Sequence, residues 1–195
     1  MPKNETNGSI PIKKKLNGSI PKTNGTESKL DQVLIHELNH IFEGENSLIS
    51  FFPEMIKKVS DEDMEETMNE LLQQNKKQFE RLDKILSRYS FKYLKTEKCE
   101  VMESHIGECK SVMSKFHQGP ALDASLIIQL QKILHHKIAS YGSICEISDV
   151  LNLSRIADVL DRTLLECENA DVNLTQLAEE INSDAYEEIL THMPN

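Results

Sequence analysis

Residues 34–48 read LIHELNHIFEGENSL, and their apolar side chains recur at the three- and four-residue spacing of an amphipathic helix. Since each residue turns a helix by about 100°, these apolar positions gather within about 40° of Leu34. The same stripe contains Glu45. A carboxylate there is costly unless it is paired, hydrogen-bonded or bound to a metal. The stretch therefore predicts a helix whose buried side contains one charge that needs a partner. The apolar residues of the stripe are Leu34, Leu38, Ile41, Leu48 and Phe52.

The same stretch also contains the H-E-x-x-H pattern of zinc peptidases, formed by His36, Glu37 and His40. In such sites the two histidines bind zinc and the glutamate is the general base. On the helical wheel, His36 and His40 lie about 200° and about 240° from Leu34, which predicts that the motif faces solvent. The longer zinc motif also fails, because position 43 is a glutamate instead of a glycine. A zinc peptidase is therefore the third reading, behind the two developed below.

The composition favours a single helical body. The chain has 195 residues, 38% hydrophobic and only 5% aromatic, with no Trp, which suits long helices better than a β-sandwich. Its net charge of −10 argues against nucleic acid as the main partner. No apolar run approaches the roughly 18 residues that span a membrane. The four cysteines form no C-x-x-C pair, which predicts reduced thiols and a cytoplasmic protein.

Residues 1–29 form a low-complexity segment in which NGSIP occurs at 7–11 and again at 17–21. The density of Gly, Pro, Asn and Ser predicts a flexible tail. Two Ile-Pro anchors could also dock on a protein partner with avidity. In this respect the tail loosely resembles those that load ferritin-like cargo into encapsulin shells, so a shell partner stays open beside a free arm. The predicted domains are this tail, a body over 30–185 and a C-terminal tail over 186–195.

The body reads as five helices. The first follows Ser28, and no segment alternates like a strand, so the fold class is an all-α bundle. Ser60 or Asp61 could cap the second helix. The four later helices are expected at about 61–89, 97–116, 121–151 and 154–181, as judged from their apolar periodicity.

A glutamate in the apolar stripe of the first helix is typical of ferritin-like bundles, and the sequence resembles the YciE/YciF family of bacterial ferritin-like stress proteins. The resemblance covers roughly residues 30–183. It implies four long helices, a short crossover helix between the second and third of these, and often a homodimer. The stretches that carry it are FEGE at 42–45, QFERL at 78–82, KCEVME at 98–103, IASYG at 138–142 and LTQLA at 174–178.

The chain departs from that family at the implied metal site. Glu45 matches the first-helix glutamate, but the core-facing positions 134, 137 and 167 are Leu, Lys and Cys here instead of acids. On the second helix, Leu71, Gln73, Gln74 and Asn75 stand where the family has His, two Glu and Thr. A di-iron or di-manganese centre needs several carboxylates. The residual candidate ligands are Glu45, Glu103, Glu166 and Asp171.

These departures suggest that the Lys137 ammonium takes the place of the metal. We expect it to pair with Glu45 and Asp171, with Asn75 and Gln78 as polar neighbours. Cys167 is expected as a small buried side chain in the same stripe. In the other arrangement, Lys137 reaches the edge of the bundle and Glu45 faces a water-filled pocket.

Beside the zinc peptidase, two functions are open, and they differ in whether the residual ligands still bind a metal. The first is a stress-associated interaction or structural protein without enzyme activity and without a cofactor. The alternative is an iron or manganese protein with oxidase, ferroxidase or peroxide-handling activity.

Overall fold

The computed structural model describes residues 28–88 and 98–191, with side chains to residue 187. Within these ranges the chain forms five α-helices and no strand, so the predicted all-α class is confirmed. The NGSIP repeats lie outside the described residues. The helices are α1 (Lys29–Ile56), α2 (Glu62–Arg88), α3 (Glu100–Lys115), α4 (Pro120–Val150) and α5 (Ser154–Thr191).

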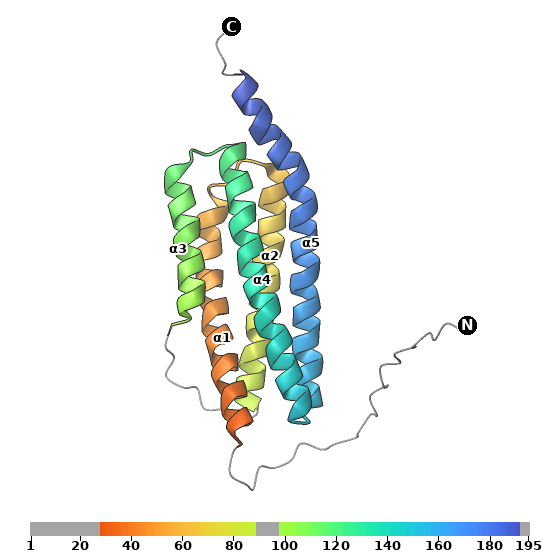
Figure 1. Cartoon of the computed structure of the whole chain (residues 1–195). Helices are drawn as coiled ribbons and strands as arrows, with labels where there is room; N and C mark the ends of the chain where they lie inside the picture. The colour runs from red at the N-terminus through yellow and green to blue at the C-terminus, as the bar shows by residue number, and fades with distance from the viewer. Residues whose placement is uncertain (1–27, 89–97, 192–195) are drawn as a thin grey trace, which may run out of the picture.

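The start of α1 and the bounds of α2, α3 and α4 fall close to the predicted positions, but α5 is longer than expected. It continues to Thr191, whereas the apolar periodicity predicted an end at about Ile181. The part of the expected C-terminal tail up to residue 191 is therefore helical. Figure 1 shows this last part of α5 projecting beyond the ends of the other helices. Because it has no core to pack against there, its sequence lacks the apolar periodicity on which the prediction was based.

Four long helices form the bundle. α1 packs against α2 and α4, and α5 packs against α4 and α2. The shorter α3 packs on α1 and α4 from the outside of this bundle (Figure 1). It carries the chain from the end of α2 back along the bundle to the start of α4, as the implied crossover helix does. Leu, Ile and Met side chains dominate the buried core.

Polar side chains fix the starts of two helices. Ser28 and Asp31 form a capping box at α1, each accepting a hydrogen bond from the backbone N–H of the other. Asp61 caps α2, since its Oδ1 accepts from the backbone N–H of Met64 at 2.8 Å. Asp123 of α4 is fully buried and accepts from the backbone N–H groups of Ser60 and Asp61. The start of α4 thus supplies an anion to the N-terminus of α2.

Gly44 of α1 faces the start of α3. A Cβ added to Gly44 would lie 3.4 Å from Cys99 Sγ and 3.5 Å from Met102 Cβ. These are ordinary van der Waals distances, so the start of α3 packs directly on this face of α1.

In the described part of the chain, none of the helices is long and apolar enough to cross a membrane.

Candidate functional site

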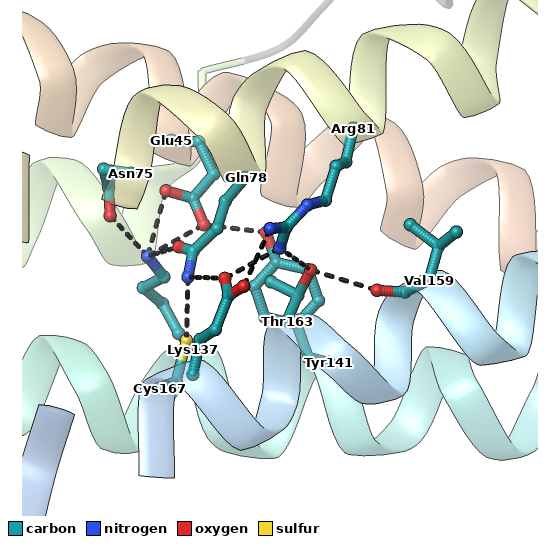
Figure 2. Close-up of polar contacts among 10 residues, drawn as sticks. Glu45, Asn75, Gln78, Arg81, Lys137, Tyr141, Val159, Thr163 and Cys167 are labelled. Carbon is teal, nitrogen blue, oxygen red and sulfur yellow. Dashed lines mark hydrogen bonds and ion pairs between the residues drawn. The ribbon is translucent and has the colours of Figure 1, made fainter. Parts of the chain in front are cut away.

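A buried ion pair joins α1 and α4 in the middle of the bundle. The exposed fractions of Glu45 and Lys137 are 0% and 1%. Lys137 Nζ lies 3.0 Å from Glu45 Oε1 and 3.1 Å from Oε2. Figure 2 shows both side chains pointing toward each other inside the bundle. The alternative arrangement, with the Lys137 ammonium at the edge of the bundle, is therefore not the one observed.

Two amides of α2 complete the surroundings of this ammonium. Lys137 Nζ donates to Asn75 Oδ1 at 2.5 Å and to Gln78 Oε1 at 2.7 Å. Both amides are buried, and both turn their oxygen, the acceptor atom, toward the cation. With the two oxygens of Glu45, four acceptors surround the three N–H bonds of one ammonium. This arrangement compensates a charge that burial alone would disfavour.

Tyr141 is the second partner of the buried carboxylate, and one that the sequence analysis missed. Its hydroxyl donates to Glu45 Oε1 at 2.8 Å, and the residue is fully buried. Burial, followed by the negative charge of Glu45, raises the pKa of the Tyr141 phenol well above 10. The available signal was its spacing, since a residue four positions after Lys137 shares its helix face. A tyrosine is also an ordinary core residue, so the spacing alone did not single it out.

A second ion pair, also missed from the sequence, joins α2 to α5. Arg81 and Glu166 form two parallel hydrogen bonds of 2.7 Å, with side chains 23% and 27% exposed. Burial raises the pKa of the Glu166 carboxyl, but hydrogen bonds from Arg81 and Gln78 outweigh it, and the net direction is downward. Arg81 is also 3.3 Å from Thr163 Oγ1. The fork geometry of arginine suits this bidentate contact.

Gln78 connects the two ion pairs. Its oxygen accepts from Lys137, while its Nε2 donates to Glu166 Oε2 at 3.1 Å. The same nitrogen lies 3.8 Å from Cys167 Sγ, and the Cys167 side chain is buried as expected. Burial raises the pKa of this thiol to about 11. We call the connected residues the core network: Glu45, Asn75, Gln78, Arg81, Lys137, Tyr141 and Glu166 (Figure 2).

Two of the candidate ligands lie outside this network. The expected pairing of Asp171 with Lys137 is absent, because Asp171 lies 3.0 Å from the exposed imidazole of His135 instead. Asp171 is at the edge of the apolar stripe, close enough to the α4–α5 surface to reach that ring. Glu103 accepts from Ser47 Oγ at 2.8 Å across the α1–α3 contact.

The H-E-x-x-H residues lie on two different kinds of surface. His36 is exposed as predicted, with 62% of its side chain accessible. The expectation for His40 was wrong, since it is half-buried and its Nδ1 lies 3.6 Å from Cys99 Sγ of the α3 N-terminus. A helical wheel identifies the most apolar side of one helix. It does not show that a second helix, here α3, covers another side of α1. In the residues that the structure describes, no three His, Cys, Asp or Glu side chains lie together so that they could hold a metal ion.

The core network does not fit a di-metal centre. Both oxygens of Glu45 contact Lys137, and Oε1 also accepts from Tyr141. Both oxygens of Glu166 accept from Arg81. Two organic cations therefore occupy the two carboxylates that the network contains, and a metal would need several that are available to it.

Comparisons with known proteins agree with the fold. A family model described as "Domain of unknown function (DUF892)" matches residues 29–187. Protein YciF of Escherichia coli (strain K12) is 30% identical over 149 residues, which make up 76% of this chain and 90% of that protein. The crystal structure of the E. coli stress protein YciF matches with a TM-score of 0.76 at 29% identity, over 80% of this chain and 99% of that one. YcfI from Rhodopseudomonas palustris matches with a TM-score of 0.72 at 24% identity, over 76% and 94% of the two chains, and supports the fold alone.

Proposed function

Because the chain belongs to the DUF892 family, we propose that it is a YciF-like, stress-associated bundle in which an internal ammonium takes the place of a metal centre. It acts through its surface, as an interaction or structural protein, and not through a reaction in its core. The stress association comes from the description of E. coli YciF as a stress protein.

The observation that carries this proposal is the position of the Lys137 nitrogen. It lies within 3.1 Å of both oxygens of Glu45, where the resemblance implies a metal ligand. A divalent ion about 4 Å from an ammonium would be repelled by about 8 kcal/mol at an effective dielectric constant of about 20. Loading a metal at Glu45 would therefore require Lys137 to leave or to lose its proton.

The polar lining of the core supports the same conclusion. Asn75 and Gln78 present their oxygens to the cation, and Tyr141 presents its O–H to the carboxylate. These groups supply the hydrogen bonds that a buried ammonium and a buried carboxylate need. The ammonium and the carboxylate are both satisfied, although the amide nitrogen of Asn75 has no hydrogen-bond partner. Such a paired charge favours one packing of the four helices, which suits a structural role.

The direct test is the metal content of the purified full-length chain. The protein is produced in medium supplemented with iron and manganese, and its metals are measured by mass spectrometry after gel filtration. We expect well under about 0.1 ion per chain, whereas an intact di-metal centre of this fold class would hold about two. One or more iron or manganese ions per chain, together with peroxide or ferrous-iron turnover, would replace this proposal by the enzymatic alternative.

A further inference from the structure

One contact between α1 and α3 joins two side chains that are common zinc ligands. His40 Nδ1 of α1 lies 3.6 Å from the Sγ of Cys99, the N-cap residue of α3. His40 is half-buried and Cys99 is buried. Neither residue belongs to the core network, so this contact is separate from the two ion pairs described above.

The distance between these two atoms is that of two ligands on one zinc ion. Zinc binds a cysteine sulfur at about 2.3 Å and a histidine nitrogen at about 2.0–2.1 Å, with tetrahedral angles. Two such ligands of one ion are therefore about 3.6 Å apart. Since a hydrogen bond between a thiol and an imidazole can have the same length, a metal site also requires a further donor and a favourable charge.

His36 supplies the further donor. It precedes His40 by four residues, the spacing at which two histidines on one face of a helix bind zinc. Their rings are stacked, with centroids 6.1 Å apart, whereas two imidazoles on one tetrahedral zinc have centroids roughly 5 Å apart. Two of the three donors thus meet already. The third reaches them by a rotation of the His36 side chain, which is 62% exposed and free to turn.

The charges around Cys99 favour a cation. Burial raises the pKa of its thiol, and the negative charges of Glu103 and Glu37 also raise it, because they disfavour the thiolate. A zinc ion reverses this balance, since it displaces the thiol proton and is itself attracted by both carboxylates. The core network offers the opposite field, because the Lys137 ammonium is already there.

The donor set selects zinc over the metals of a carboxylate centre. Thiolate and imidazole ligands suit zinc, whereas di-iron and di-manganese centres of ferritin-like bundles use several carboxylates. The ion can reach Cys99 from the solvent side of α1, where His36 and Glu37 are exposed. Because Cys99 begins α3, an ion bound here connects the outer helix to the bundle.

We propose that His36, His40 and Cys99 form a zinc site between α1 and α3, with water at the fourth position. The two histidines of the H-E-x-x-H pattern are ligands in this site, and the third ligand comes from a neighbouring helix. The bound ion holds α3 against α1. The site is independent of the proposed loss of the di-metal centre, because none of its three ligands belongs to the core network.

Cobalt(II) tests the site directly, because a thiolate bound to it gives a charge-transfer absorption in the near ultraviolet. The reduced, metal-free full chain is titrated with Co²⁺ alone, and Zn²⁺ is then added. We expect the absorption to saturate at about one ion per chain and to disappear as zinc replaces cobalt. A wild-type protein that shows no such absorption would overturn the proposal.

Variants assign the ligands. Cys99→Ser should abolish the cobbalt–thiolate absorption. His36→Gln, at an exposed position, should fold and should weaken zinc binding at least about tenfold, since even residues that only support a ligand change metal affinity by about 10–100-fold. His135→Gln and Cys145→Ser are the matched controls, at an exposed histidine and a half-buried cysteine of α4, and should bind zinc as the wild type does.

Two results would contradict the assignment. Absorption that persists in Cys99→Ser would place the ion at another cysteine, and unchanged zinc affinity in this variant would leave the two histidines as its only ligands. If Cys99→Ser does not fold, the comparison of His36→Gln with His135→Gln decides, since equal zinc affinities of these two proteins would rule the site out. Zinc should also raise the hydrogen-exchange protection of residues 100–115 in the wild type, and unchanged protection would exclude its role in holding α3.

Discussion

At the scale of single residues, the central feature is a lysine whose ammonium has four oxygen acceptors in the interior of the protein. Such a pair is not a strong source of net stability, because removing both charges from water costs nearly as much as their attraction returns. Its effect appears when one partner is removed, since the other is then a buried and uncompensated charge. Lys137 and Glu45 are thus expected to depend on each other.

Lys137→Met should lower the free energy of unfolding by about 3–5 kcal/mol, because it leaves the Glu45 carboxylate buried without its cation. Adding Glu45→Leu should recover much of that loss, and the difference is the coupling energy of the pair. Urea unfolding at neutral pH measures all three proteins. Lys77→Met, at an exposed lysine of α2, is the control and should change the stability by less than about 0.5 kcal/mol. A fully stable Lys137→Met protein would contradict the assigned pairing.

Tyr141→Phe keeps the ring but removes the O–H that donates to Glu45, and should cost about 1–2 kcal/mol. The pKa of the phenol is raised in the folded protein, mainly by burial. The contribution of this residue is therefore present below the unfolded pKa of about 10 and is lost as the pH rises above it. The wild type should lose stability above about pH 10 more steeply than Tyr141→Phe does. Equal slopes for the two proteins would mean that this phenol ionises freely.

Part of this site could be predicted from the sequence. Glu45 and Lys137 both fall in apolar stripes where a charge is conspicuous, so their pairing follows from two helical wheels. Tyr141 is compatible with any core, and Arg81 and Glu166 lie at stripe edges where charges are common. Their contacts depend on how two neighbouring helices are rotated relative to each other. The apolar periodicity of a single helix does not give that rotation.

At the scale of helices, polar contacts between elements fix how their ends and sides meet. Asp123 of α4 accepts hydrogen bonds at the N-terminus of α2, and Arg81 of α2 holds Glu166 of α5. The sequence predicted the start of α1 and the extents of α2 to α4 because apolar periodicity and turn residues mark them. It did not place α3 on the H-E-x-x-H side of α1, since that contact joins residues of two helices, such as His40 and Cys99, which the periodicity of either helix alone does not relate.

Asp123→Ala should lower the free energy of unfolding by about 2 kcal/mol, because the backbone N–H groups of Ser60 and Asp61 lose their acceptor at a buried helix end. Thermal and urea unfolding report the loss. Asp123→Asn keeps an acceptor oxygen and should recover part of it. Asp158→Ala, at an exposed acid of α5, is the control and should be nearly neutral. Equal stability of the Asp123→Ala and Asp158→Ala proteins would refute this capping role.

Glu166→Gln should weaken the contact between α2 and α5 by about 1 kcal/mol at neutral pH, since the pair is partly exposed to solvent. The pKa of Glu166 is lowered in the folded protein, so its contribution is present above the unfolded value of about 4.3 and is lost as the pH falls through the folded value. The difference in stability between wild type and variant should therefore shrink in acid. A difference that stays constant from about pH 7 to about pH 3 would exclude the ion pair as its source.

At the scale of the whole molecule, the family and the fold were both recognisable from the sequence, and both are confirmed. Short stretches spread over the body carry the resemblance, and bundle topology follows from the order and length of the helices. The interior chemistry depends on single residues, above all Glu45 and Lys137, whose side chains meet in the core. The fold and the proposed exchange of a metal for a side-chain cation therefore rest on different residues, and only the fold follows from the helix pattern.

The central claim is that an ammonium occupies the place of a metal in this bundle. Its most direct test is anomalous diffraction at the iron and manganese edges, from crystals of the full chain grown with each ion in excess. The account predicts no anomalous peak inside the bundle and the Lys137 nitrogen between Glu45, Asn75 and Gln78. A peak beside Glu45 and Glu166, with Lys137 turned away from them, would contradict it.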